Sequence, residues 1–166
     1  LEKDFEPIAL VSNNPQLMVA KNDLPAKTLS ELVKWMKDNP GKINFVNQNA
    51  AANVTGVLFE KLTGQKVQFI PYRGAGPAMT DLIAGTVALL VVQGAVALPQ
   101  IRAGKIKALA NLSPQRSASM PDIPTSDESG VKGLYMSGWF GFWAPKGTPK
   151  EVIAKLNAAT TEALAD

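Results

Sequence analysis

The chain has 166 residues and a hydrophobic content of 46%, which is enough for one substantial core and argues against intrinsic disorder. Its 17 basic and 14 acidic side chains leave a net charge of +3, and the basic residues are scattered, so nucleic acid is not an expected partner. Cysteine and histidine are absent, which excludes thiol nucleophiles, imidazole bases, disulfides and the usual zinc or copper ligand sets.

The N-terminal residue is Leu1, and no leader of basic, apolar and small residues follows it. We therefore expect that any secretion signal was removed or lies upstream. The longest apolar run, residues 87–92, is far shorter than the roughly 20 residues that a membrane-spanning helix needs. No such helix is expected.

Short apolar runs alternate with amphipathic helical patterns, which is typical of a parallel sheet flanked by helices. The first helix follows a capping box formed by Thr28 and Glu31, and Asn, Pro and Gly at 39–41 end it. A strand is predicted at 43–46. These features indicate an α/β fold.

The next helix follows a loop rich in Asn and Ala, and Gly64 ends it. Its larger apolar residues are expected to form the buried stripe: Val54, Val57, Leu58 and Leu62. A strand is predicted at 67–70, and the turn after it leads into a helix with Pro77 at the first helical position and with Leu82 and Ile83 directed inward.

The second half of the chain continues the same alternation. A strand covered on both faces is predicted at 87–92, a short helix up to Gly104 and another strand at 106–112. Residues 113–133 are rich in Pro, Ser, Asp and Gly, which predicts a loop and the best internal boundary.

An aromatic strand is predicted at 139–144, followed by a capping box at Thr148 and Glu151 and a long helix. Five apolar residues are expected to form the buried stripe of that helix: Val152, Ile153, Leu156, Ala163 and Leu164. The helical pattern reaches Asp166 without a stop signal, so we expect a truncated sequence.

Three strand-to-helix turns are predicted at the carboxyl edge of one sheet, where open α/β sheets bind ligands. Helix N-termini present unpaired N–H groups and a positive dipole end, which suit a carboxylate. A small carboxylated solute is therefore the expected ligand. The candidate binding residues are Asn47, Gln48, Asn49, Ala50, Asn53, Tyr72, Arg73, Gly74, Ala75, Gly76 and Gln93.

Each of these features also has a purely structural interpretation. Gly74 and Gly76 serve equally to turn the backbone before Pro77, the Asn-rich loop is compatible with a solvated turn, and an isolated Arg73 is compatible with simple solvation. Neither a phosphate-binding G-x-x-x-x-G-K-[ST] loop nor a dinucleotide-binding G-x-G-x-x-G motif occurs, so no cofactor is expected.

Aromatic side chains cluster near the last predicted strand. Stacking on a ligand or on single-stranded nucleic acid is one interpretation, but no Lys or Arg is interleaved, so core packing is favoured. The cluster comprises Tyr135, Trp139, Phe140, Phe142 and Trp143.

With these residues in place, the chain resembles the substrate-binding receptors of tripartite tricarboxylate transporters, the Bug family of extracytoplasmic solute receptors. The resemblance runs nearly end to end. It rests on the segments DFEPIALV at 4–11, LPAKT at 24–28, PYRGAGPA at 71–78, LPQIRAG at 98–104, WFG at 139–141 and GTP at 147–149.

The resemblance implies a periplasmic-binding-protein-like (type II) fold in which two lobes close over an acidic solute and hold it through backbone amides and ordered waters. It assigns residues 12–132 to a nearly complete second lobe, and 1–11 with 133–166 to part of the first, with strands that cross from one lobe to the other. It also implies that a Pro- and Gly-rich ligand loop of the first lobe lies upstream. Many relatives carry an Asp where Val92 stands, so an amino-acid ligand is disfavoured.

The function that we predict from the sequence is a periplasmic, non-enzymatic receptor that delivers a di- or tricarboxylate or an aromatic acid to the membrane subunits of a transporter. A sensory module with the same clamp remains an alternative. A small α/β hydrolase or transferase is a weaker one, because no G-x-S-x-G motif and no His occur. If the first lobe is incomplete, exposed apolar surface near 139–144 is expected to make the chain self-associate.

Overall fold

A computed structural model describes residues 3–165 and divides them into two compact units. One unit is Pro15–Ser137, and the other joins the residues up to Asn14 with those from Gly138 onward. The elements in chain order are β1 (Phe5–Lys21), α1 (Leu29–Asp38), β2 (Asn44–Asn47), α2 (Ala50–Thr63), β3 (Gln68–Pro71), α3 (Ala75–Ile83), β4 (Leu89–Gln93), α4 (Gly94–Arg102), β5 (Ile106–Asn111), β6 (Ser137–Pro145) and α5 (Lys150–Ala165).

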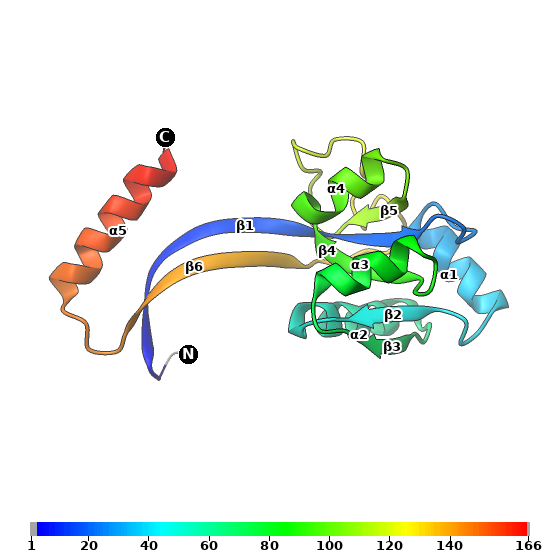
Figure 1. The fold of residues 1–166 in the computed structure, drawn as a ribbon, viewed down its shortest axis with the longest axis horizontal. Helices are drawn as coiled ribbons and strands as arrows, with labels where there is room; N and C mark the ends of the chain where they lie inside the picture. The colour runs from blue at the N-terminus through cyan, green and yellow to red at the C-terminus, as the bar shows by residue number, and fades with distance from the viewer. Residues whose placement is uncertain (1–2, 166) are drawn as a thin grey trace. The chain divides into compact units, whose positions relative to one another are not determined.

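The sheet of the unit Pro15–Ser137 has the order β3-β2-β4-β1-β5. Strand β2 runs parallel to β3 and β4, whereas β1 lies antiparallel between β4 and β5. Helices α1 to α4 are arranged around these strands (Figure 1). The predicted α/β class with a parallel-rich sheet is confirmed. Strand β1 was not predicted, although its buried run of Leu17, Met18, Val19 and Ala20 has the composition of a central strand.

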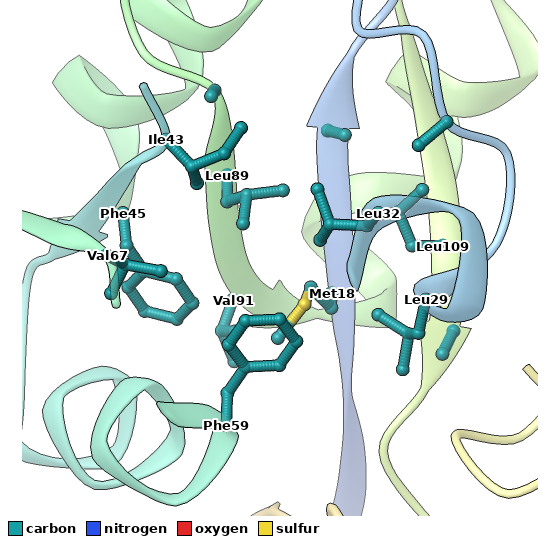
Figure 2. Packing of buried hydrophobic residues seen from close by; sticks show 14 of the residues in the cluster. Met18, Leu29, Leu32, Ile43, Phe45, Phe59, Val67, Leu89, Val91 and Leu109 are labelled. Atoms are coloured by element: carbon teal, nitrogen blue, oxygen red, sulfur yellow. The ribbon is translucent and has the colours of Figure 1, made fainter. Parts of the chain in front are cut away.

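The two faces of this sheet are covered by different helices. One cluster of buried side chains joins α1 and α2 to the sheet, and the other joins α3 and α4 to it. Figure 2 shows the ring of Phe59, from α2, beside Val91 and Met18 of the sheet. Because both faces are covered, the strands are apolar on both sides, as in other α/β sheets.

The predicted cap of α1 at Thr28 is confirmed, and the second bond of the predicted capping box is shifted by one residue. The Thr28 hydroxyl accepts a hydrogen bond of 3.1 Å from the amide of Glu31, and the Glu31 carboxylate accepts one of 2.7 Å from the amide of Lys27. The Thr28 bond satisfies an N–H group of the first turn, whereas Glu31 bonds the residue before the cap instead of the Thr28 amide.

The predicted buried stripe of α2 is confirmed only at Leu58, which is half-buried and packs against the cluster on that face, and is wrong at its other three residues. Val54, Val57 and Leu62 are 55%, 51% and 43% exposed, whereas the buried face consists mainly of small residues: Ala52, Thr55, Gly56 and Phe59. At Gly56 an added Cβ atom would lie only 2.4 Å from the Phe69 ring. The helix therefore approaches the sheet too closely at Gly56 for a larger side chain there, and Val54, Val57 and Leu62 lie on the outer face.

Two details of α3 also differ from the prediction. The helix begins at Ala75 after Gly74, so Pro77 occupies the third helical position rather than the first. Leu82 is buried as expected, but Ile83 is 39% exposed.

The segment 113–133 is an irregular connection, as predicted, but it is no boundary between units. Met120, Ile123 and Val131 are buried in the clusters of the unit Pro15–Ser137. A parallel bridge between Asn111 and Thr125 also ties the segment to β5. A few buried apolar side chains, rather than regular secondary structure, therefore hold this segment against the rest of the unit.

The second unit contains the start of β1, most of β6 and helix α5. Trp139, Phe140 and Phe142 are 54%, 55% and 55% exposed, so the favoured core packing of the aromatic cluster is wrong in this chain. No side chain of α5 within 150–165 is buried, which also contradicts the stripe predicted for it. The Thr148 hydroxyl donates to the carbonyl of Pro145 at 2.7 Å rather than accepting from the Glu151 amide.

None of the helices described over residues 3–165 has the length and apolar character needed to cross a membrane.

We predict that Gly56→Ala destabilises the protein by about 1–3 kcal/mol, because the new methyl group must displace the Phe69 ring. Gly76→Ala is the matched control, since Gly76 also lies in a helix but has open space around it, and it should change stability by less than about 1 kcal/mol. Urea unfolding of both variants measures the difference. Equal effects would contradict the close approach of α2 to the sheet.

A second prediction concerns Glu60, which links the end of α2 to β3. Its carboxylate accepts hydrogen bonds of 2.9 Å from the Val67 amide and from the Lys66 ammonium. These two bonds, the Val67 bond first, are the main causes that lower the pKa of Glu60 below its ordinary value. Because the folded pKa lies below the unfolded one, this stabilisation is present above the unfolded pKa and is lost as pH falls through the folded pKa.

Glu60→Gln should therefore lower the free energy of unfolding by about 1 kcal/mol near neutral pH, and its difference from wild type should vanish in acid. Asp122→Asn, which removes one exposed carboxylate, is the matched control and should change the free energy of unfolding by less than about 0.5 kcal/mol near neutral pH. Urea unfolding at several pH values measures both. A constant difference across the acid range would show that the ionised carboxylate is not the stabilising form.

Candidate functional site

Three helices begin at one edge of the sheet, directly after three neighbouring parallel strands. Helix α2 starts three residues after β2 ends, α3 starts four residues after β3, and α4 follows β4 without a gap. Strand β2 lies between β3 and β4, and the amide of Tyr72 bonds the carbonyl of Asn47 at 3.1 Å across the first pair. The three predicted turns therefore lie at a common edge of the sheet.

The N-termini of these helices differ in how their amides are satisfied. Asn49 caps α2, because its side-chain oxygen accepts a 2.9 Å hydrogen bond from Ala52. Gly74 precedes α3 and Gln93 precedes α4, and neither supplies a side-chain cap. The first amides of α3 and α4 are thus free of the usual capping partner and suit an anion.

Gly74 has a backbone φ of +129°, a conformation that L side chains rarely adopt. An added Cβ atom would meet no other atom within 4 Å. The requirement for glycine here is therefore conformational rather than steric, and Gly76, with no positive φ, does not share it. Gly74 directs the chain so that the amides of Ala75 and Gly76 begin α3.

Amide side chains line the same edge. Gln48 is half-buried, and its Nε2 donates to the carbonyl of Val91 at 2.6 Å. Its Oε1 is buried and has no hydrogen-bond partner among the described residues. Gln93 is half-buried and is paired across the sheet with Gln16 of β1, which is 7% exposed. Sequence analysis did not identify Gln16, although it stands directly before the apolar run of β1.

Tyr72 makes its side-chain contact elsewhere. Its hydroxyl donates to the Asp81 carboxylate of α3 at 2.5 Å, and this hydrogen bond is the first cause that raises the pKa of Tyr72. The ring packs partly against the cluster beneath α3 and α4. Tyr72 thus fixes the turn to α3, and in this structure its hydroxyl is engaged rather than free.

Arg73 is the only cation in the three turns, and its side chain is exposed. It forms no ion pair with any residue described between 3 and 165. Its guanidinium is consequently available to a carboxylate, without being held in one orientation.

The structure places ten of the eleven predicted residues between the last residue of a strand and the second residue of the helix that follows it. Asn53 is the exception, because it is the fourth residue of α2, its amide donates to the carbonyl of Asn49 and its side chain is exposed. Within residues 3–165, no cluster of three acidic, His or Cys side chains could hold a metal ion. The arrangement offers neutral hydrogen-bond donors and one exposed cation, Arg73.

Comparison with known proteins agrees with this geometry. The profile of a family described as "Tripartite tricarboxylate transporter family receptor" matches residues 1–166. BugT of Bordetella pertussis is 36% identical over 164 residues, which is 98% of this chain and 50% of BugT. The chain spans about half the length of the curated relatives that it matches.

Solved structures show the same similarity. The periplasmic binding protein BugD is 41% identical, with a TM-score of 0.85 over 98% of this chain and 55% of BugD. MatC from Rhodopseudomonas palustris, solved with bound malate, is 33% identical, with a TM-score of 0.86 over 98% of this chain and 56% of MatC. An R. palustris protein solved with adipate is 28% identical, with a TM-score of 0.87 over 95% and 53%.

The predicted family and the predicted periplasmic-binding-protein-like fold are therefore confirmed. Family members are periplasmic solute-binding proteins, a class that is not enzymatic. The chain belongs to the tripartite tricarboxylate transporter receptor family.

Proposed function

We propose that this chain forms part of a periplasmic receptor that binds a small carboxylate and delivers it to the membrane subunits of a tripartite tricarboxylate-type transporter. The observation that carries the proposal is the edge at which α2, α3 and α4 begin. A di- or tricarboxylate, or an aromatic acid, is the expected ligand. The similar structures with malate and with adipate support a dicarboxylate.

The binding chemistry follows from the donors at this edge. The first amides of α3 and α4 have no side-chain cap, and the helix dipole favours negative charge beside them. Neutral amides of Gln48, Gln93 and Gln16 add donors and acceptors for the rest of the solute. A carboxylate held this way needs no paired cation, which leaves Arg73 a minor role.

An amino-acid ligand fits this edge less well. Val92 is 5% exposed and packs in the cluster beneath α3 and α4, so position 92 offers no carboxylate for an amino group. None of the three turns contains Asp or Glu. The proposed solute therefore carries negative charge without a compensating amine.

We place the residues 12–132 in one lobe of the receptor and 1–11 with 133–166 in the other, on the family resemblance. The division at Pro15–Ser137 supports boundaries within five residues of these. In this proposal the three turns form one side of the solute site. The receptor binds its solute unchanged and acts without a cofactor.

Self-association through the exposed aromatic residues of β6 stays a prediction. Trp139, Phe140 and Phe142 give the 166-residue chain an apolar surface that favours association. Light scattering of this chain against concentration decides the question, and a monomer at every concentration would refute it.

The first binding prediction compares Arg73→Ala with Gly74→Val in the full-length protein, with malate as the probe. Arg73→Ala should weaken binding by no more than about fivefold, because an exposed cation contributes about 1 kcal/mol or less. Gly74→Val should weaken it by more than about tenfold, because valine does not tolerate the backbone that orients the amides of α3.

Gly85→Val is the matched control, since Gly85 has a φ of +82° and open space but follows the other end of α3. It should lower stability without changing affinity. Calorimetry on all three variants and wild type measures the order. A larger loss from Arg73→Ala than from Gly74→Val would overturn the proposal that backbone amides hold the carboxylate.

The second prediction is that bound malate is not converted. The chain offers no imidazole or thiol, and the three turns contain no acidic side chain that could serve as a base. Long incubation of malate with stoichiometric protein, followed by mass spectrometry, should return malate alone. A product formed in proportion to the protein would favour an enzyme.

A further inference from the structure

A second concave surface lies on the unit Pro15–Ser137, away from the three helix N-termini. It is a groove of about 590 Å³ between α1, the last turn of α2 and the loop after Gly130, and its lining includes Val33, Lys34, Lys37, Leu62, Gly130 and Lys132. Leu62 is twelve residues beyond the start of α2, which corresponds to about 18 Å along a helix. We refer to this surface as the basic groove.

Unpaired positive charge is the main feature of the basic groove. Lys34, Lys37 and Lys132 are exposed, and none of them has an ion pair or a side-chain hydrogen bond with the residues described over 3–165. No acidic residue lines the groove. The three ammonium groups therefore form no ion pair with any residue in the described range.

The carboxylates nearest in sequence do not neutralise these lysines. Glu31 accepts the amide of Lys27, and Asp127 accepts the Gly133 amide at 3.0 Å and the Tyr135 hydroxyl at 2.7 Å. Asp38 follows Lys34 by four residues, the spacing of a helical ion pair, yet no such pair forms between these two described residues.

The wall of the groove is held rigidly. The Ser129 hydroxyl accepts the amide of Leu29 at 2.9 Å and donates to the carbonyl of Leu109 at 2.7 Å, while the Ser30 amide donates to the Ser129 carbonyl at 2.8 Å. At Gly130, where φ is +99°, an added Cβ atom would lie 2.6 Å from that of Ser30. The loop bearing Lys132 is thus fixed against the start of α1, and the groove is preformed.

The groove combines this charge with apolar surface. Val33 is half-buried and Leu62 is 43% exposed, so two aliphatic side chains lie among the three lysines. Apolar surface beside like charges is typical of a surface that binds an amphipathic segment of opposite charge.

We propose that the basic groove docks an acidic amphipathic segment of a partner protein. Glu or Asp side chains of that segment pair with Lys34, Lys37 and Lys132, and an aliphatic side chain contacts Val33 and Leu62. A lipid surface fits less well, because it is broad and cannot enter a concave groove. Docking here leaves the edge with the three helix N-termini open, so the proposal does not depend on the carboxylate site.

The test uses the full-length protein and two fluorescein-labelled peptides, one of repeated Glu-Glu-Leu and one of repeated Gln-Gln-Leu. Wild type should bind the acidic peptide, more weakly as salt is added, and should bind the neutral peptide at least about tenfold less tightly. The triple variant Lys34→Gln, Lys37→Gln, Lys132→Gln should lose about tenfold in affinity for the acidic peptide.

The triple variant Lys105→Gln, Lys150→Gln, Lys155→Gln is the matched control, because it removes the same charge from exposed lysines outside the groove. It should bind like wild type. Fluorescence anisotropy reports affinity, and circular dichroism verifies that each variant is folded.

Two further variants and one further probe complete the test. Leu62→Asp should weaken acidic-peptide binding, whereas Val54→Asp, also on the exposed face of α2 but outside the groove, should not. Equal losses in both triple variants, or no binding of the acidic peptide by wild type, would overturn the proposal. Tighter, groove-dependent binding to vesicles with one-third anionic lipid would overturn it in favour of a membrane surface.

Discussion

The parallel pairing of β2 with β3 and β4 is the constraint on which the rest of this structure depends. Phe45 of β2 is in register with Phe69 on one side and with Leu89 on the other. Since each strand is followed at once by a helix, this register places three turns that are far apart in sequence at one edge. The first amides of the helices lie near one another because the parallel strands end at the same edge. An anion site can therefore form there without a cluster of cations.

The close approach of α2 to the sheet has consequences on both of its sides. Gly56 and Ala52 allow the helix to lie against Phe69 and Phe45, whose rings meet edge to face at 5.8 Å. The larger aliphatic side chains are then left on the outer face. One of them, Leu62, contributes the apolar surface beside the lysines of the basic groove, so packing within the core and chemistry at the surface are linked by one helix.

Local patterns predicted much of this fold because capping, turn chemistry and apolar runs act over a few residues. The start of α1 at Thr28, the glycine end of α2 at Gly64 and the turn at Gly74 follow from those rules. The direction and place of β1 do not, because its insertion between β4 and β5 depends on pairings with residues 69 to 94 positions away in sequence.

The candidate site shows the same division. Its loops could be predicted, since each follows a predicted strand, but the partners of individual side chains could not. The bond of Gln48 to Val91 and the place of Gln16 beside Gln93 arise only when strands pair, and the bond of Tyr72 to Asp81 depends on how α3 folds back on the turn before it. The buried face of α2 was mispredicted because the prediction used hydrophobicity alone, whereas the Phe69 ring leaves no space for a larger side chain at Gly56.

Amide chemical shifts measured by NMR during a titration with malate test the central claim most directly, because they report each backbone N–H separately. If helix N-termini hold a carboxylate, the largest changes in the full-length protein should include the amides of Ala75, Gly76, Gly94 and Ala95. Large changes confined to residues away from these helix starts, with those four amides unmoved at saturation, would contradict the account.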